Sequence, residues 1–112
     1  MDYSSFGLQD KIAIVTGASQ GIGRAIAIGL ASAGAHVVLA KHPDGKNDAI
    51  KEVQAEIEAL GRKAIIVPTD VSDVTQVQAM VNRAKETFGR VDILVNNAGW
   101  TGTTLAIDVT EE

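Results

Sequence analysis

Short apolar runs alternate with longer amphipathic segments along this chain. The runs are rich in β-branched residues and are bounded by turn-forming residues, a pattern typical of strands buried in a parallel sheet. Four such runs predict strands over residues 11–16, 36–40, 63–68 and 91–95. A turn is expected between the second run and the next segment, where Pro43 is followed by Asp44 and Gly45.

The three longer segments predict helices, because their apolar residues recur every three or four positions. The predicted helices span residues 21–33, 48–60 and 73–88, and a glycine follows each of them. In the second, Ile50, Val53 and Ile57 share one face. We therefore expect that face to pack against the sheet.

The order of these elements predicts an α/β fold. Strands that alternate with helices form a doubly wound parallel sheet, here an incomplete one with helices on both faces. Right-handed crossovers predict the strand order 3-2-1-4, with the first two helices on one face and the third on the other. The run 91–95 should then be an open, apolar, parallel edge, and one helix should not be able to cover a face of four strands. We expect the chain alone to be marginally stable, sticky or oligomeric.

The last part of the chain, from Trp100 onward, is polar and turn-rich. Residues 108–112 look like the start of a helix, with Thr110 as N-cap and acidic residues in the first turn. This predicts that residues 1–112 are a single domain truncated at its C-terminus.

Composition excludes several classes of function. The net charge is −4, which argues against a nucleic-acid partner. There is no cysteine, so disulfides, thiolate nucleophiles and cysteine zinc sites are all excluded. No apolar run approaches the length of a membrane span, and the N-terminus lacks the pattern of a signal peptide. We expect a cytoplasmic protein with no membrane partner.

The stretch "TGASQGIG", from Thr16 to Gly23, lies between the first predicted strand and the first predicted helix. A tight strand-to-helix turn directs the free N–H groups of the helix at an anion. Gly17 would permit the turn, Gly21 would leave room for a pyrophosphate, and Gly23 would let the helix pack on the strand. Ser19 would add a hydroxyl, with Gln20 and Ile22 lining the approach. The alternative is a loop whose glycines only provide flexibility.

This stretch, together with "NNAG" at residues 96–99 and the Asp70-Val71 pair, resembles the short-chain dehydrogenase/reductase family. The resemblance runs from about Lys11 to Glu112 and is closest to 3-oxoacyl-carrier-protein reductases and to sugar or gluconate dehydrogenases. It implies a Rossmann-type domain that binds NAD or NADP. The implied reaction is hydride transfer between the nicotinamide and a small carbonyl or alcohol substrate.

The family's cofactor-binding residues can be placed on this sequence through the same motifs. The resemblance implies that the pyrophosphate and adenosine ribose contact Gly17, Ser19, Gln20, Gly21, Ile22 and Gly23. Asp70 would accept a hydrogen bond from the adenine amino group, and the Val71 N–H would meet the adenine ring. The cofactor would be flanked by Asn97, Ala98 and Gly99. Alternatively, Asp70 is a helix N-cap or turn residue, and Asn96 and Asn97 tie strand ends together.

The end of the second predicted strand bears on the choice between NAD and NADP. A carboxylate there would bind both ribose hydroxyls and repel a 2′-phosphate, but this chain has Lys41 and His42 instead. Lys41 can offer a positive charge, and His42 can do so when protonated. The sequence therefore favours NADP over NAD, although Gln20 stands where NADP-binding family members often have a basic residue. Lys41 as a solvated surface lysine is the alternative.

The family's catalytic Tyr-x-x-x-Lys is absent from these residues. The single tyrosine is Tyr3, ahead of the first strand, so we assign no catalytic residue and no metal ligand. Trp100 could line a substrate mouth or cap an apolar patch. The sequence thus predicts the cofactor-binding half of an oxidoreductase, expected to form a homo-oligomer. The alternatives are a non-catalytic dinucleotide-binding module and an inactive truncated remnant.

Overall fold

The computed structural model describes residues 7–19, 21–43, 48–97 and 104–107. Its strands form one sheet in the order β3-β2-β1-β4-β5. The strands are β1 (Ile12–Thr16), β2 (His36–Lys41), β3 (Ala64–Pro68), β4 (Ile93–Asn96) and β5 (Thr104–Ile107). The first four strands run parallel, and their order is the predicted 3-2-1-4.

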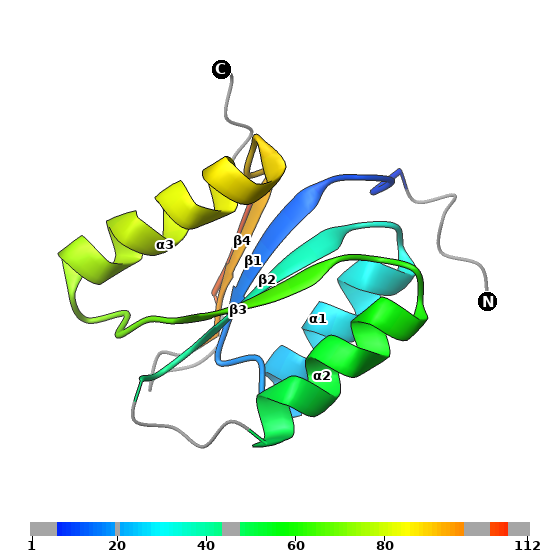
Figure 1. The fold of residues 1–112 in the computed structure, drawn as a ribbon, viewed down its shortest axis with the longest axis horizontal. Coiled ribbons are helices and arrows are strands. Elements are labelled where there is room, and N and C mark those ends of the chain that lie inside the picture. Colours follow the sequence, from blue (N-terminus) through cyan, green and yellow to red (C-terminus); the bar gives the residue numbers. More distant parts are fainter. Residues whose placement is uncertain (1–6, 20, 44–47, 98–103, 108–112) are drawn as a thin grey trace.

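Helices cover both faces of this sheet, as predicted. Figure 1 shows α1 (Gly21–Ser32) and α2 (Asp48–Ala59) side by side on one face and α3 (Val74–Phe88) on the other. The alternation of side chains along β1 explains the two layers, because Val15 contributes to the core under α1 and α2 while Ile14 contributes to the core under α3. None of the described helices is long and apolar enough to cross a membrane.

The central strand β1 is the most enclosed part of the core. All of its residues are at most 3% exposed, because strands flank it on both edges and helices cover both faces. Burying one large apolar side chain in such a position stabilises the fold by about 1.5–3 kcal/mol. The apolar run that predicts this strand is therefore also the centre of the core.

The ends of α3 follow recognisable capping chemistry. Asp73 is the N-cap, and its side chain accepts hydrogen bonds from the N–H groups of Thr75 and Gln76. Gly89 ends the helix in the left-handed conformation, with φ of 88°. The predicted helix thus begins one residue early, because it counts the cap as part of the helix.

The expectation of an open edge at β4 is wrong. Strand β5 pairs with β4 in antiparallel fashion, from Ile93 opposite Ile107 to Asn96 opposite Thr104. Strand β5 has four residues, too few to show a clear alternation of apolar and polar side chains, so the sequence predicts a polar tail there instead. Trp100 and the predicted helix start at residues 108–112 lie outside the described residues.

The α3 face of the sheet is less completely covered than the opposite face. Of the described helices, α3 alone lies there, whereas α1 and α2 lie on the opposite face. Partly buried apolar side chains border both cores, and on the α3 side they are Ile65, Val77, Val81, Phe88 and Leu94.

Candidate functional site

The sequence motifs meet at one edge of the sheet, where the parallel strands end. β1 runs into Gly17, β2 into His42, β3 into Thr69 and Asp70, and β4 into Asn97. β1 lies between β2 and β4, and the chain leaves it over one face and reaches β4 from the other. Open α/β sheets bind ligands at such a reversal, outside the carboxyl ends of the strands.

The glycines of the β1–α1 turn are required for two different reasons. Gly17 and Gly21 have φ of 63° and 61°, a left-handed conformation that side chains disfavour. Among the described residues, a Cβ on Gly21 would meet nothing within 4 Å, so this turn borders open space there. A Cβ on Gly23 would lie 2.0 Å from the Gly17 carbonyl oxygen and 2.6 Å from the Asn97 amide nitrogen. Gly23 therefore lets α1 approach the strand ends closely.

The first turn of α1 faces this open space with an electropositive backbone. The helix begins at Gly21, and its first turn contains no acidic residue that would oppose an anion. Ile22 is 63% exposed, so its side chain is accessible beside this turn. The turn thus fits the pyrophosphate of a dinucleotide, since it offers room, free N–H groups and no repelling charge.

Hydrogen bonds tie the end of β4 to the β1–α1 turn. The Thr16 hydroxyl accepts from the Asn97 N–H at 2.8 Å and donates to the Asn96 side-chain oxygen at 3.1 Å. The Asn97 side-chain amide donates to the Gly17 carbonyl at 3.2 Å. The structural role considered for both asparagines is therefore confirmed. Thr16 is a positioning residue that the motifs do not identify. A polar residue at the end of a buried strand is the feature of the sequence that could have indicated it.

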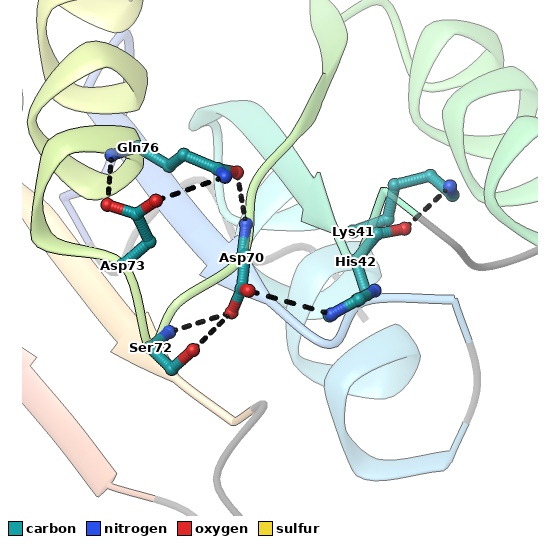
Figure 2. A network of polar contacts seen from close by, with 6 residues as sticks. All are labelled: Lys41, His42, Asp70, Ser72, Asp73 and Gln76. Carbon is teal, nitrogen blue, oxygen red and sulfur yellow. Dashed lines mark hydrogen bonds and ion pairs between the residues drawn. The ribbon is translucent and has the colours of Figure 1, made fainter.

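Asp70 is a turn residue, while the neighbouring Asp73 is the helix cap. The Asp70 carboxylate accepts from the Ser72 hydroxyl at 2.6 Å and from the Ser72 N–H at 3.0 Å, as Figure 2 shows. These two bonds, with a smaller effect of nearby His42, hold the pKa of Asp70 below its ordinary value. Asp70 is therefore an ionised acceptor at neutral pH, and Val71 beside it is half-buried.

The two basic residues at the end of β2 behave differently. Lys41 is only 7% exposed, and its ammonium donates to the His42 carbonyl at 2.8 Å. The alternative of a solvated surface lysine is therefore wrong. The His42 side chain is 55% exposed, and its Nε2 lies 4.0 Å from the Asp70 carboxylate. Figure 2 shows the Lys41 side chain extending away from Asp70 while the His42 ring points toward it.

The structure thus brings together, at one sheet edge, most residues that the resemblance assigns to the cofactor. They are Gly17, Ser19, Gly21, Ile22, Gly23, Lys41, Asp70, Val71 and Asn97. The other three, Gln20, Ala98 and Gly99, lie outside the described residues. Within the part of the chain that the structure describes, no group of three side chains could hold a metal ion.

Comparison with known proteins gives the same family over nearly the whole chain. A family model described as short chain dehydrogenase matches residues 11–112. The L-rhamnose 1-dehydrogenase (NAD(P)(+)) of Sphingomonas sp. strain SKA58 is 52% identical over 93 residues, covering 82% of this chain and 35% of that protein. The 2-dehydro-3-deoxy-D-gluconate 5-dehydrogenase of Dickeya dadantii is 39% identical over 99 residues, covering 88% of this chain and 37% of that protein.

Solved structures show the same arrangement of the backbone. The hydroxysteroid dehydrogenase from Escherichia coli superposes with a TM-score of 0.75 at 43% identity, covering 85% of this chain and 39% of that one. A short-chain type dehydrogenase/reductase from Mycobacterium marinum gives a TM-score of 0.77 at 39% identity, with coverage of 88% and 39%. Among the curated relatives named above, the chain spans little more than a third of each protein's length.

Proposed function

Because this chain belongs to the short-chain dehydrogenase family, we propose that it is the dinucleotide-binding half of an NAD(P)-dependent oxidoreductase. The observation that carries the proposal is the β1–α1 turn, where left-handed Gly21 borders open space at the start of α1. When bound, the nicotinamide would accept or supply the hydride. The substrate of the whole protein is proposed to be a small carbonyl or alcohol, and the protein a homo-oligomer.

Different residues of the chain are proposed to bind different parts of the cofactor. The N–H groups at the start of α1, with the Ser19 hydroxyl, would bind the pyrophosphate. Asp70 would accept from the adenine amino group, because its carboxylate is ionised and held in place by Ser72. Asn97 would keep the strand ends at the correct separation through its bond to the Gly17 carbonyl. Gln20, Ala98 and Gly99 are assigned to the same site through the family motifs.

Catalysis is not assigned to these residues. The 112 residues contain no Tyr-x-x-x-Lys, the pair that the family resemblance implies for proton donation, so no proton donor is assigned. The chain by itself is therefore proposed to bind the dinucleotide without reacting.

The proposal is tested by titrating the purified chain with NADH and NADPH in a calorimeter at pH 7.5. We expect saturable binding of at least one of them with one site per chain. The matched variants are Gly21→Ala and Gly61→Ala, because both glycines have positive φ and open space at the Cβ position. Both variants should lose similar stability, but Gly61 lies just ahead of β3, at the opposite edge of the sheet.

The expected result is that Gly21→Ala weakens binding at least tenfold while Gly61→Ala binds like the unmodified chain. Circular dichroism establishes that both variants are folded. A folded chain that binds neither dinucleotide contradicts the proposal. Equal weakening by the two variants would also contradict it, because binding would then depend on stability rather than on the turn.

A further inference from the structure

The Gln76 side chain spans the loop between β3 and α3. Its amide oxygen accepts a hydrogen bond from the Asp70 N–H at 2.8 Å, and its amide nitrogen donates to the Asp73 carboxylate at 3.3 Å. Figure 2 shows Gln76 on one side of Asp70 and Ser72 on the other. The loop is therefore fixed to the first turn of α3 by a single side chain that contacts it at two points.

This arrangement differs from the usual role of a glutamine three residues after an N-cap. In a capping box, the side chain at that position reaches back to the N–H of the cap residue itself. Here the Asp73 N–H donates to the Asp70 carbonyl instead, at 3.0 Å. The Gln76 side chain reaches three residues further, to the N–H of Asp70. It therefore holds the residue proposed to bind the adenine, and not the helix end alone.

The contacts of Asp70 act at two levels. The sheet holds the chain as far as Thr69, whose N–H donates to the Lys41 carbonyl at 2.7 Å. Ser72 orients the Asp70 carboxylate, but it belongs to the same loop and would move with it. Gln76 joins the Asp70 backbone to α3, which packs on the sheet. The contact with Gln76 therefore fixes where the carboxylate lies relative to the rest of the fold.

We infer that Gln76 is the positioning residue for recognition of the adenine base, acting through the Asp70 carboxylate. This rests on the proposed function, which places the adenine amino group against that carboxylate. Asp70 and Gln76 are both half-buried, so without the Gln76 side chain the Asp70 N–H would bond to water and the loop would gain freedom. Affinity for adenine would then fall with the fraction of molecules whose loop keeps the position that fits the base.

A base without the amino group separates this role from a purely structural one. Hypoxanthine carries an oxygen where adenine has the amino group, so an ionised carboxylate binds adenine and repels hypoxanthine. Asp70 is such a carboxylate, because hydrogen bonds from Ser72 lower its pKa. The measured quantity is the ratio of the affinities for NAD⁺ and for nicotinamide hypoxanthine dinucleotide. A general loss of stability would lower both affinities and leave their ratio unchanged.

The test is a calorimetric titration of the chain with these two dinucleotides at pH 7.5, or with their 2′-phosphates if the chain binds only NADPH. We expect the unmodified chain to prefer adenine about tenfold, the size of one hydrogen bond to a charged group. In Asp70→Asn the ratio should approach one, because an amide can accept from adenine or donate to hypoxanthine. In Gln76→Ala the ratio should fall about threefold or more toward that limit.

Gln78→Ala is the matched control, because Gln78 is an exposed glutamine of the same helix. Its ratio should equal that of the unmodified chain. Alanine is a good helix former, so both variants should fold, which circular dichroism checks. A second measurement needs no ligand: hydrogen exchange at the Asp70 N–H should be faster in Gln76→Ala than in Gln78→Ala.

An equal loss of both affinities in Gln76→Ala, with the ratio unchanged, would overturn the inference and leave the proposed function standing. The same fall of the ratio in Gln78→Ala would also overturn it, as would a ratio near one in the unmodified chain. Binding of no dinucleotide, with or without the 2′-phosphate, would overturn the proposed function and this inference together.

Discussion

The two edges of the sheet are built from the same strands but differ in how their polar groups are satisfied. At the amino edge, where the parallel strands begin, side chains close the structure on itself. At the carboxyl edge, a left-handed glycine turn and the first N–H groups of α1 face open space. The comparison suggests that one edge is built for stability and the other for a ligand.

Asp92 shows how the amino edge is closed. It is 4% exposed and accepts hydrogen bonds from the Ile12 N–H at 2.9 Å and from Arg90 Nε at 2.9 Å. Burial pushes the pKa of Asp92 upward, but the bonds from Arg90 and Ile12 outweigh burial and leave that pKa below its ordinary value. The carboxylate thus joins the start of β1 to the segment before β4.

His36 closes a second position on the same edge. The sequence indicates only the first residue of a strand, but the ring makes three contacts in the structure. Its Nδ1 accepts from the Lys63 N–H at 2.9 Å, and its Nε2 lies 3.4 Å from Asp10. The ring stacks on Phe88 with the centroids 5.8 Å apart. The starts of β2 and β3 and the end of α3 are thereby joined.

Among substitutions at the two edges, Gly23→Ala at the carboxyl edge should have the largest effect on stability and binding. The new methyl group would lie 2.0 Å from the Gly17 carbonyl oxygen, a backbone atom that cannot move away easily. We expect a loss of about 3 kcal/mol of unfolding free energy, typical of overpacking, and loss of dinucleotide binding. Urea unfolding and calorimetry measure the two effects.

Gly29→Ala is the control for this substitution. Gly29 lies in the same helix with nothing within 4 Å of its Cβ position, so alanine should stabilise α1 by about 0.5–1 kcal/mol. Its binding should be unchanged. Equal effects of the two substitutions would show that the close approach at Gly23 is not required.

The next effect concerns the amino edge. Asp92→Ala leaves the Ile12 N–H unpaired in the core, which should cost about 2 kcal/mol, with little added by the half-exposed Arg90. Dinucleotide affinity of the folded variant should not change, because the site lies at the other edge. The exposed Asp10 provides the control as Asp10→Asn, because asparagine tolerates its left-handed φ of 62°, and this variant should cost less than about 1 kcal/mol.

The effect of Asp92→Ala on stability should itself depend on pH. The pKa of Asp92 is lowered on folding from its ordinary 3.8, so its contribution is complete above that value and is lost as pH falls through the lowered pKa. The stability difference between the unmodified chain and Asp92→Ala should therefore shrink in acid. A difference that grows as the pH falls would contradict the assignment.

The smallest effect is expected from Asp73→Ala, which removes the N-cap of α3. The two first-turn N–H groups it binds would turn to water, at a cost of about 1 kcal/mol. Thr75→Ala is the control, because the exposed Thr75 contributes only its backbone to the cap. A cost no greater than that of the control would contradict the assignment of Asp73 as the cap.

Periodicity was sufficient to predict most of the fold because long helices and buried strands carry strong patterns. The predicted helix over 48–60 differs from α2 by one residue at its end, and the order of β1–β4 is as expected. β5 was missed because its pairing with β4 is a tertiary contact of a very short run.

The sequence predicts where the candidate site lies, but not which of its side chains are buried or contact one another. Lys41 and His42 are adjacent and both basic, yet only the fold determines that one is buried and the other faces Asp70. Asp70 and Asp73 are both suitable N-caps by residue type, and the position of the first helical turn decides between them. Such choices depend on three-dimensional neighbours that a linear pattern does not contain.

The most direct test of the account is an amide NMR spectrum of the ¹⁵N-labelled chain recorded during titration with NADH. The account predicts that shifts concentrate at the carboxyl edge, at Gly17, Ser19, Gly21, Val71 and Asn97. The amides of the amino edge, at Gly34, Gly61 and Asp92, should stay in place. Shifts centred on the amino edge, or a spectrum unchanged at saturating NADH, would contradict the claim that the carboxyl edge is the ligand site.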